Sequence, residues 1–113
     1  MITIYGIKNC DSVKKAIKFF KAHSLEYTLV DFKQTPVDAK KIASWLEHTD
    51  IKTLFNARST TYRTLKLKEK NLTEKEQQEY LAKENLLIKR PVIEYKDSLI
   101  VGFKEDSYKG IFL

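Results

Sequence analysis

At the beginning of the chain, the spacing of hydrophobic residues changes from that of a strand to that of a helix, and then back to that of a strand. Residues 2–5 alternate between isoleucine and the side chains of threonine and tyrosine, as in a half-buried strand. Apolar residues then recur with helical spacing over 13–20, which predicts an amphipathic helix that ends near His23. Residues 26–32 are rich in aromatic and β-branched side chains and predict a second strand. This order is that of a βαβ unit, whose strands are parallel and joined by a right-handed crossover.

The middle of the chain shows helical patterns only. Two stretches have the spacing of a capping box and predict helix starts, at residues 35–38, with Pro36 in the first turn, and at 72–76. Further helices are expected to begin near residues 51 and 60, and the alternation of leucine and charge over 66–70 predicts an exposed segment. The apolar side chains of the predicted helices include Ile42, Trp45, Leu46, Tyr80 and Leu81. Residues 36–84 are therefore expected to be all-helical.

The end of the chain returns to strands. Residues 91–95 and 99–101 flank the polar turn 96–98, which predicts an antiparallel hairpin. A short final helix is expected, because Tyr108, Ile111 and Phe112 fall at helical spacing. The whole pattern predicts one α/β domain over 1–113, in which a four-stranded sheet is interrupted by the helical insertion 36–84.

Composition and charge narrow the class of protein. With 113 residues, of which 42% are hydrophobic, the chain is long enough for one globular core. The net charge of +6 has two interpretations, attraction to nucleic acid and a solvated lysine-rich surface, and the second is favoured because no nucleic-acid motif accompanies the charge. No apolar run is long enough to span a membrane and no signal peptide is evident. We therefore expect a cytoplasmic protein without membrane or nucleic-acid partners.

The single cysteine, Cys10, lies at the predicted junction of the first strand and the first helix. The free N–H groups and the dipole of a helix start stabilise a thiolate relative to a thiol. Lys8 would add to this field and Asp11 would oppose it, and either Asn9 or Asp11 can provide the helix cap. The alternative is a buried, inert cysteine. The junction favours an accessible thiol, because loops that close on a helix start are usually exposed.

The lone thiol also limits the chemistry. One cysteine cannot form an internal disulfide, so any redox cycle passes through a mixed disulfide with another molecule. Val13 stands where a CxxC motif would have its second cysteine. His23 and His48 lie near predicted helix ends, where a capping role is expected, and with Cys10 they do not make a metal site.

Four stretches of sequence, in order along the whole chain, resemble a known family. They are residues 4–11 with 14–16, residues 54–63, residues 88–93 and residues 101–103. Together they are similar to the ArsC-like family, the arsenate reductases with their Spx and YffB relatives, and the opening and the Gly102-Phe103 ending look closest to the YffB-like branch. The resemblance implies a thioredoxin-like fold, a four-stranded mixed sheet of the order βαβ…ββα with an inserted all-helical subdomain.

The resemblance also implies a function for individual residues. Cys10 would be the nucleophile, which forms a covalent adduct or a mixed disulfide with glutathione that glutaredoxin or a second glutathione resolves. Guanidinium groups suit the binding of oxyanions and carboxylates because their planar donors meet two oxygens at once. The Arg90–Pro91 bond is implied to be cis and next to Cys10, and for Arg58 the alternative is an ordinary surface arginine. The residues implied to bind substrate or glutathione are Lys8, Asn9, Arg58, Arg63, Arg90 and Pro91.

Two departures from the family pattern bear on the function. Arsenate reductases of the family carry a third arginine on the last strand, near the place of Gly102 here, and loss of one charge-assisted contact weakens oxyanion binding by about tenfold or more. This argues against arsenate as the substrate. Spx regulators often pair their cysteine with a second one, for which Val13 and its neighbours supply no counterpart. This argues against a redox-switched regulator.

Two classes of function follow from the resemblance. The first is a glutathione-dependent thiol or oxyanion reductase, with no tightly bound cofactor and with glutathione or another small thiol as co-substrate. The alternative is an Spx-like regulatory binding module that contacts RNA polymerase or another protein without catalysis. A monomer is expected in either case.

Overall fold

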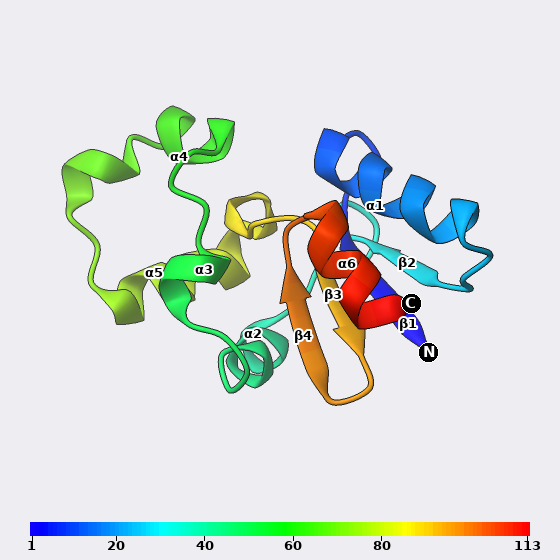
Figure 1. Ribbon diagram of the computed structural model, residues 1–113. Coiled ribbons are helices and arrows are strands. Elements are labelled where there is room, and N and C mark those ends of the chain that lie inside the picture. Colours follow the sequence, from blue (N-terminus) through cyan, green and yellow to red (C-terminus); the bar gives the residue numbers. More distant parts are fainter. The chain divides into compact units, whose positions relative to one another are not determined.

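The computed structural model describes residues 1–113. The strands are β1 (Ile2–Gly6), β2 (Thr28–Asp31), β3 (Val92–Tyr95) and β4 (Ser98–Val101) (Figure 1). The helices are α1 (Asp11–Ala22), α2 (Ala39–Trp45), α3 (Ile51–Leu54), α4 (Thr60–Thr64), α5 (Glu74–Lys83) and α6 (Glu105–Phe112), with the 3-10 helices η1 (Leu67–Lys70) and η2 (Asn85–Leu87). No helix has the length and apolar character needed to cross a membrane.

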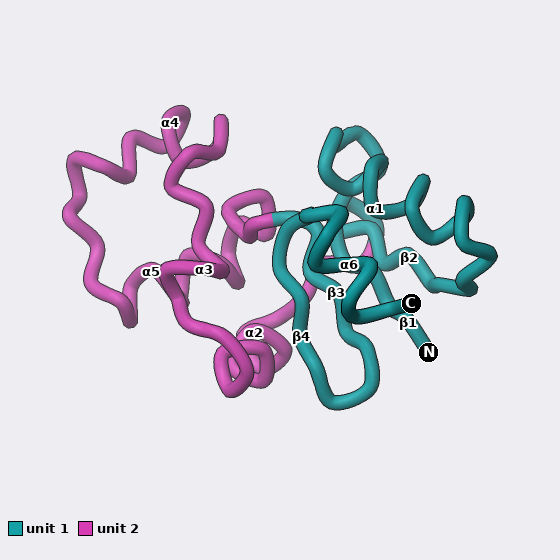
Figure 2. The backbone as a smooth tube through the Cα atoms, in the orientation of Figure 1, with its two compact units in different colours: residues 1–34, 90–113 teal, residues 35–89 magenta.

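The chain is divided into two compact units (Figure 2). The first combines Met1–Gln34 with Arg90–Leu113, and the second is Thr35–Lys89. All four strands and the helices α1 and α6 belong to the first unit, whereas the second unit contains the remaining helices. The segment predicted to be helical, 36–84, thus contains α2 to α5 and η1, and the helical part of the chain continues beyond it to η2.

The sheet of the first unit has the strand order β2-β1-β3-β4. β1 pairs with β2 in parallel and with β3 antiparallel, and β3 and β4 form the antiparallel hairpin predicted from the sequence. At the centre, Ile4 is paired with Leu29 on one side and Ile93 on the other. The second strand is shorter than the predicted range 26–32. The four-stranded mixed sheet with its βαβ and ββα parts has the topology of the thioredoxin fold, as expected.

The helices α1 and α6 cover one face of this sheet. Ile2, Ile4 and Ile93 provide the sheet side of the core, and the helices contribute Ala16, Phe19, Phe20, Tyr108 and Phe112. The ring of Phe20 lies 5.0 Å from that of Phe112 and 5.9 Å from that of Tyr108, measured between centroids. Tyr108 and Phe112 define the buried face of α6, whereas Ile111, which shares their helical spacing, is 39% exposed.

A chain of hydrogen bonds connects α6 to the sheet. The Tyr108 hydroxyl donates to the carbonyl of Gly102 over 2.6 Å, and the Gly102 N–H donates to the carbonyl of Pro91 over 2.8 Å. Gly102 has φ 86°, in the left-handed region that favours glycine. The last helix thus holds the start of β3 through one buried phenol.

The second unit is built around α2 and α5, which pack against each other. Its buried side chains include Ile42, Trp45, Leu54, Leu67, Leu81, Leu87 and Ile88. Asn85 links the two ends of this unit, because its amide oxygen accepts the Val37 N–H over 2.8 Å and its amide nitrogen donates to the Val37 carbonyl over 3.2 Å. Leu67 is 1% exposed, so the prediction of a wholly exposed 66–70 segment is wrong at this residue.

One of the two predicted capping boxes is present. Thr73 Oγ1 accepts the N–H of Glu76, and the Glu76 carboxylate accepts the N–H of Thr73. The box predicted for Thr35 is wrong, since α2 begins after the N-cap Asp38, whose carboxylate accepts the N–H of Lys41 over 2.9 Å. The reason is tertiary: both backbone groups of Val37 are bonded to Asn85, which leaves Pro36 outside the helix.

We predict that Tyr108→Phe lowers the free energy of unfolding by about 1–2 kcal/mol, since it leaves the Gly102 carbonyl without its phenol donor. Burial raises the pKa of the Tyr108 phenol above its ordinary value. The unfolded chain therefore releases this proton near pH ~10 while the folded chain keeps it. The stability contributed by the neutral phenol is complete below that pH and is lost as the pH rises above it.

Urea unfolding between neutral pH and pH ~11 measures both effects. Tyr108→Phe should unfold more readily at neutral pH and lose less stability on the alkaline side than the unmodified chain. Tyr62→Phe, at a half-exposed tyrosine, is the matched control and should keep the full alkaline loss. An alkaline loss of equal size in Tyr108→Phe would contradict the argument.

Candidate functional site

A close contact between β1 and α1 determines where the candidate site lies. A Cβ atom added at Gly6 would lie 2.7 Å from Val13 Cγ2, closer than carbon atoms pack. Val13 itself is fully buried. The glycine at the end of β1 therefore allows the first turn of α1 to lie directly against the strand.

Cys10 is the N-cap residue of α1. Its backbone is extended (φ −142°, ψ 125°), and its carbonyl accepts the N–H of Lys14 over 2.9 Å. The side chain makes no capping hydrogen bond and is partly exposed. Of the residues considered for the cap, neither Asn9 nor Asp11 takes it. The thiol therefore lies at the positive end of a twelve-residue helix, and its sulfur is not used in a capping hydrogen bond.

The Arg90–Pro91 segment reaches the same end of the sheet. Tyr5 is paired with Val92 in an antiparallel register, so the next residues outward are Gly6 on β1 and Pro91 before β3. The Arg90–Pro91 peptide bond is cis, as the resemblance implied. Pro91 is buried and Arg90 is half-buried. The loop that leads from β1 to Cys10 thus starts where this segment enters the sheet.

The other residues implied by the resemblance fall into two groups. Lys8 and Asn9 are exposed in the loop before Cys10, in the first unit with Arg90 and Pro91. Arg58 and Arg63 are exposed in the second unit. The union of these two groups in one site stays a prediction.

Arg58 and Arg63 flank a short helix. The backbone N–H of Arg58 donates to the Asn56 side chain over 3.0 Å, and the hydroxyl of the buried Ser59 accepts the N–H of Tyr62 over 3.1 Å to begin α4. Arg63 belongs to the last turn of α4. Local capping therefore fixes the backbone from which both guanidinium groups extend.

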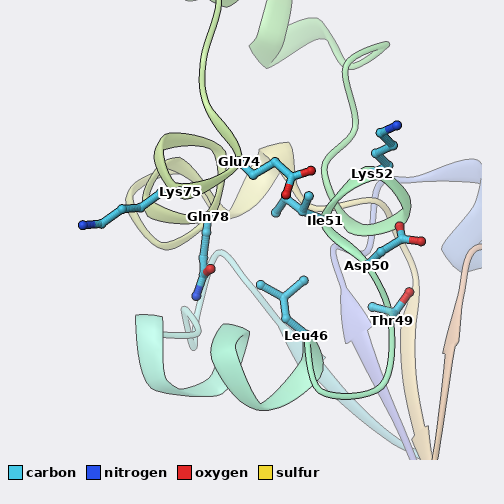
Figure 3. A pocket seen from close by; sticks show the side chains of 8 residues that line it. All are labelled: Leu46, Thr49, Asp50, Ile51, Lys52, Glu74, Lys75 and Gln78. Carbon is cyan, nitrogen blue, oxygen red and sulfur yellow. The ribbon is translucent and has the colours of Figure 1, made fainter.

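A pocket of about 620 Å³ in the second unit contains none of the predicted site residues (Figure 3). Its lining consists of Leu46, Thr49, Asp50, Ile51, Lys52, Glu74, Lys75 and Gln78. Hydrogen bonds from the side chain and backbone of Thr53 hold the pKa of Asp50 below its usual value, because Asp50 caps α3. Glu74 likewise begins α5. The Asp50 carboxylate thus caps α3, whereas the cap of α5 is made by Thr73 and Glu76 and not by Glu74. No cluster of three or more His, Cys, Asp or Glu side chains suited to a metal ion is present.

Comparison with known proteins identifies the family of the chain. The model of the ArsC family matches residues 5–111. The chain belongs to the ArsC family. An uncharacterized protein of Haemophilus influenzae is 39% identical, over 99% of both chains. The global transcriptional regulator Spx of Listeria innocua is 27% identical, over 96% of this chain and 85% of the regulator.

Solved structures of ArsC-family proteins show the same fold. The YFFB protein is 32% identical and matches with a TM-score of 0.92 over 100% of both chains. A possible arsenate reductase from Streptococcus mutans is 29% identical and matches with a TM-score of 0.81, over 100% of this chain and 98% of the reductase. The expected likeness to the YffB-like branch is confirmed.

Two residues of this ArsC-family chain have a role in the site's geometry that the sequence did not reveal. Gly6 permits the approach of α1, and Tyr108 holds Pro91 through Gly102. A glycine at the end of a predicted strand is a signal of close backbone approach and could have identified Gly6. No feature of the sequence indicates the hydrogen bond of the Tyr108 hydroxyl, since helical spacing identifies this residue only as part of the core.

We predict that Gly6→Ala destabilises the protein by about 1–3 kcal/mol, because the new methyl group overlaps the β-branched Val13. The cost should be smaller when Val13→Ala is also present, which a double-mutant cycle of urea unfolding measures. Gly110→Ala is the matched control: nothing lies within 4 Å of its added Cβ, and the helical position should gain up to about 1 kcal/mol. An equal cost of Gly6→Ala in both backgrounds would exclude the overlap as its cause.

Proposed function

We propose that the protein is a monothiol reductase that uses Cys10 and glutathione to reduce mixed disulfides. One observation carries the proposal. The Cys10 thiol is partly exposed at the N-terminus of α1, takes no part in capping, and follows the loop that leaves the sheet beside Arg90–Pro91. The partial positive charge of a helix start favours the thiolate, which is the form that attacks a disulfide.

The reaction needs only one protein cysteine. The Cys10 thiolate attacks the glutathione sulfur of a mixed disulfide, so that a bond forms between Cys10 and glutathione, and the substrate thiolate leaves and takes up a proton. A second glutathione thiolate then attacks the Cys10 adduct. This releases glutathione disulfide and restores the Cys10 thiolate. In sum, the mixed disulfide and one glutathione are converted to the free substrate thiol and glutathione disulfide, with Cys10 unchanged.

The cations of the site would bind the carboxylates of glutathione. Arg90 is half-buried just before β3 and can offer two parallel donors to one carboxylate. Lys8 and Asn9 offer exposed donors in the loop before Cys10. Pro91 is buried at the same end of the sheet and forms part of the base of the site. We extend the proposal to Arg58 and Arg63, which the family resemblance implies as further anion-binding groups.

A disulfide is favoured over arsenate as the substrate. The resemblance places Gly102 where arsenate reductases of the family carry a third arginine. In this chain both backbone groups of Gly102 are bonded, to Pro91 and to Tyr108, and no side chain extends from the position. A disulfide does not need that third charge, whereas a compact oxyanion loses a charge-assisted contact without it.

The similarity to Spx supports a second candidate, a regulatory module that binds RNA polymerase or another protein without catalysis. Its binding would not need the sulfur of Cys10. The two candidates are therefore separated by one substitution. Loss of reduction in Cys10→Ser indicates the enzyme, and partner binding without any reductase activity in the unmodified chain indicates the module.

We predict that Cys10→Ser reduces disulfide turnover to the uncatalysed rate, because a serine hydroxyl is not ionised at neutral pH and cannot form the adduct. The assay follows NADPH consumption by glutathione reductase during reduction of the mixed disulfide of glutathione and 2-mercaptoethanol. Mass spectrometry of the unmodified chain, quenched with acid during turnover, should show glutathione bound through Cys10.

Ser12→Ala is the matched control, since it changes a small polar residue in the same helical turn and leaves the sulfur in place. It should keep turnover close to that of the unmodified chain. Arg90→Gln should raise KM for glutathione more than it lowers kcat, because it removes binding and not the nucleophile. Full turnover in Cys10→Ser would rule the proposal out.

A further inference from the structure

One segment of the second unit is strongly positive. Between residues 57 and 70 there are five cationic side chains and a single acidic one, Glu69. This segment, here called the basic patch, therefore has a net charge of +4, the same as the stretch 8–21 around the start of α1. Its cations are Arg58, Arg63, Lys66, Lys68 and Lys70, and all of them are exposed.

The basic patch surrounds a pocket of about 340 Å³. The lining residues are Ala57, Tyr62, Arg63, Lys66, Lys68 and Glu69. Lys66 and Lys68 make no ion pair with any acidic side chain, whereas Lys70 lies against Tyr80, with its ammonium 3.3 Å from the hydroxyl. The pocket thus combines an aromatic wall, the aliphatic stems of lysine and arginine, and two lysine charges without an ion pair, with Glu69 as its one acidic residue.

The backbone of the basic patch is anchored to the unit. Leu67, between Lys66 and Lys68, is buried, and the ring of Tyr62 packs edge-on against Phe55 with 5.8 Å between centroids. Leu65 is 38% exposed and is one of the few large hydrophobic side chains on the surface of the protein. The cations are therefore held on an ordered scaffold next to exposed apolar surface, and not on a loose tail.

We propose that the basic patch is a docking surface for an acidic segment of a partner protein, with an apolar or aromatic side chain of that segment in the pocket beside Tyr62. Charge complementarity is the first argument, since several carboxylates in a row can meet cations that the chain itself leaves unpaired. The second is the pocket, because interfaces gain much of their affinity from one buried anchor within a polar rim.

Nucleic acid fits the basic patch less well. The helix α4 has five residues, too short to lie along a groove and read bases. Tyr62 is the single aromatic residue of the patch, so successive bases of a strand would find only one ring to stack on.

The test compares two double variants of equal charge. Lys66→Glu/Lys68→Glu reverses the pocket rim, and Lys18→Glu/Lys21→Glu reverses two exposed lysines of α1. Neither changes Cys10, Arg58 or Arg63, so the result is independent of the proposed reductase activity. The probes are a fluorescein-labelled peptide of alternating Asp and Glu with one central Phe, the same peptide with Ser for Phe, and a labelled oligothymidylate of equal charge.

Fluorescence anisotropy should show that the Phe peptide binds the unmodified chain and that the pocket double variant binds it about tenfold more weakly or worse. The α1 double variant should stay within about threefold of the unmodified chain. The Ser peptide should bind more weakly than the Phe peptide. Amide NMR shifts on addition of the Phe peptide should fall within 57–70, and circular dichroism confirms that both variants are folded.

Three results would overturn the proposal. Equal losses in the two double variants would mean that net charge alone attracts the peptide. Equal binding of the Phe and Ser peptides would remove the pocket as an anchor. Tighter binding of the oligothymidylate, lost in the pocket variant, would assign the basic patch to nucleic acid instead.

Discussion

The contact between Gly6 and Val13 is the constraint on which the candidate site depends. A side chain at position 6 would push α1 away from β1, and with it the helix start that carries Cys10. The same residue lies next to the point where Pro91 enters the sheet, and Pro91 is in turn held through Gly102 by Tyr108. A missing side chain on one strand and one buried phenol on the last helix together define the surroundings of the thiol.

Much of the fold was accessible from the sequence because its elements follow local rules. The alternation in β1, the helical spacing of α1 and the capping box at Thr73 are all decided within a few residues of chain, and the structure confirms them. The start of α2 was misplaced because Asn85, distant in sequence, takes the backbone groups of Val37. The exposure of Ile111 could not be predicted, because spacing alone does not tell which edge of an apolar stripe faces the core.

Part of the candidate site could also be predicted from the sequence, because it too follows local rules. Cys10 was identified from the junction of strand and helix, which the local pattern shows. The helix cap was expected at Asn9 or Asp11, whereas the N-cap is Cys10 itself. The cis Arg90–Pro91 bond came from family resemblance. The hydrogen bond from Tyr108 to Gly102 depends on how α6 packs against the sheet, and no pattern of residue types along the chain contains that information.

The strand order has a consequence for how the protein folds as it is synthesised. The central pair of the sheet, β1 and β3, joins the two ends of the chain, and the hydrogen bond between Tyr5 and Glu94 spans 89 residues. Closing so long a loop is entropically costly, and contacts of high sequence separation slow folding. β1 must therefore wait for its antiparallel neighbour until the whole of Thr35–Lys89 has left the ribosome. The βαβ part and the helical unit can form first, and the chain commits to its complete sheet only at the end of synthesis.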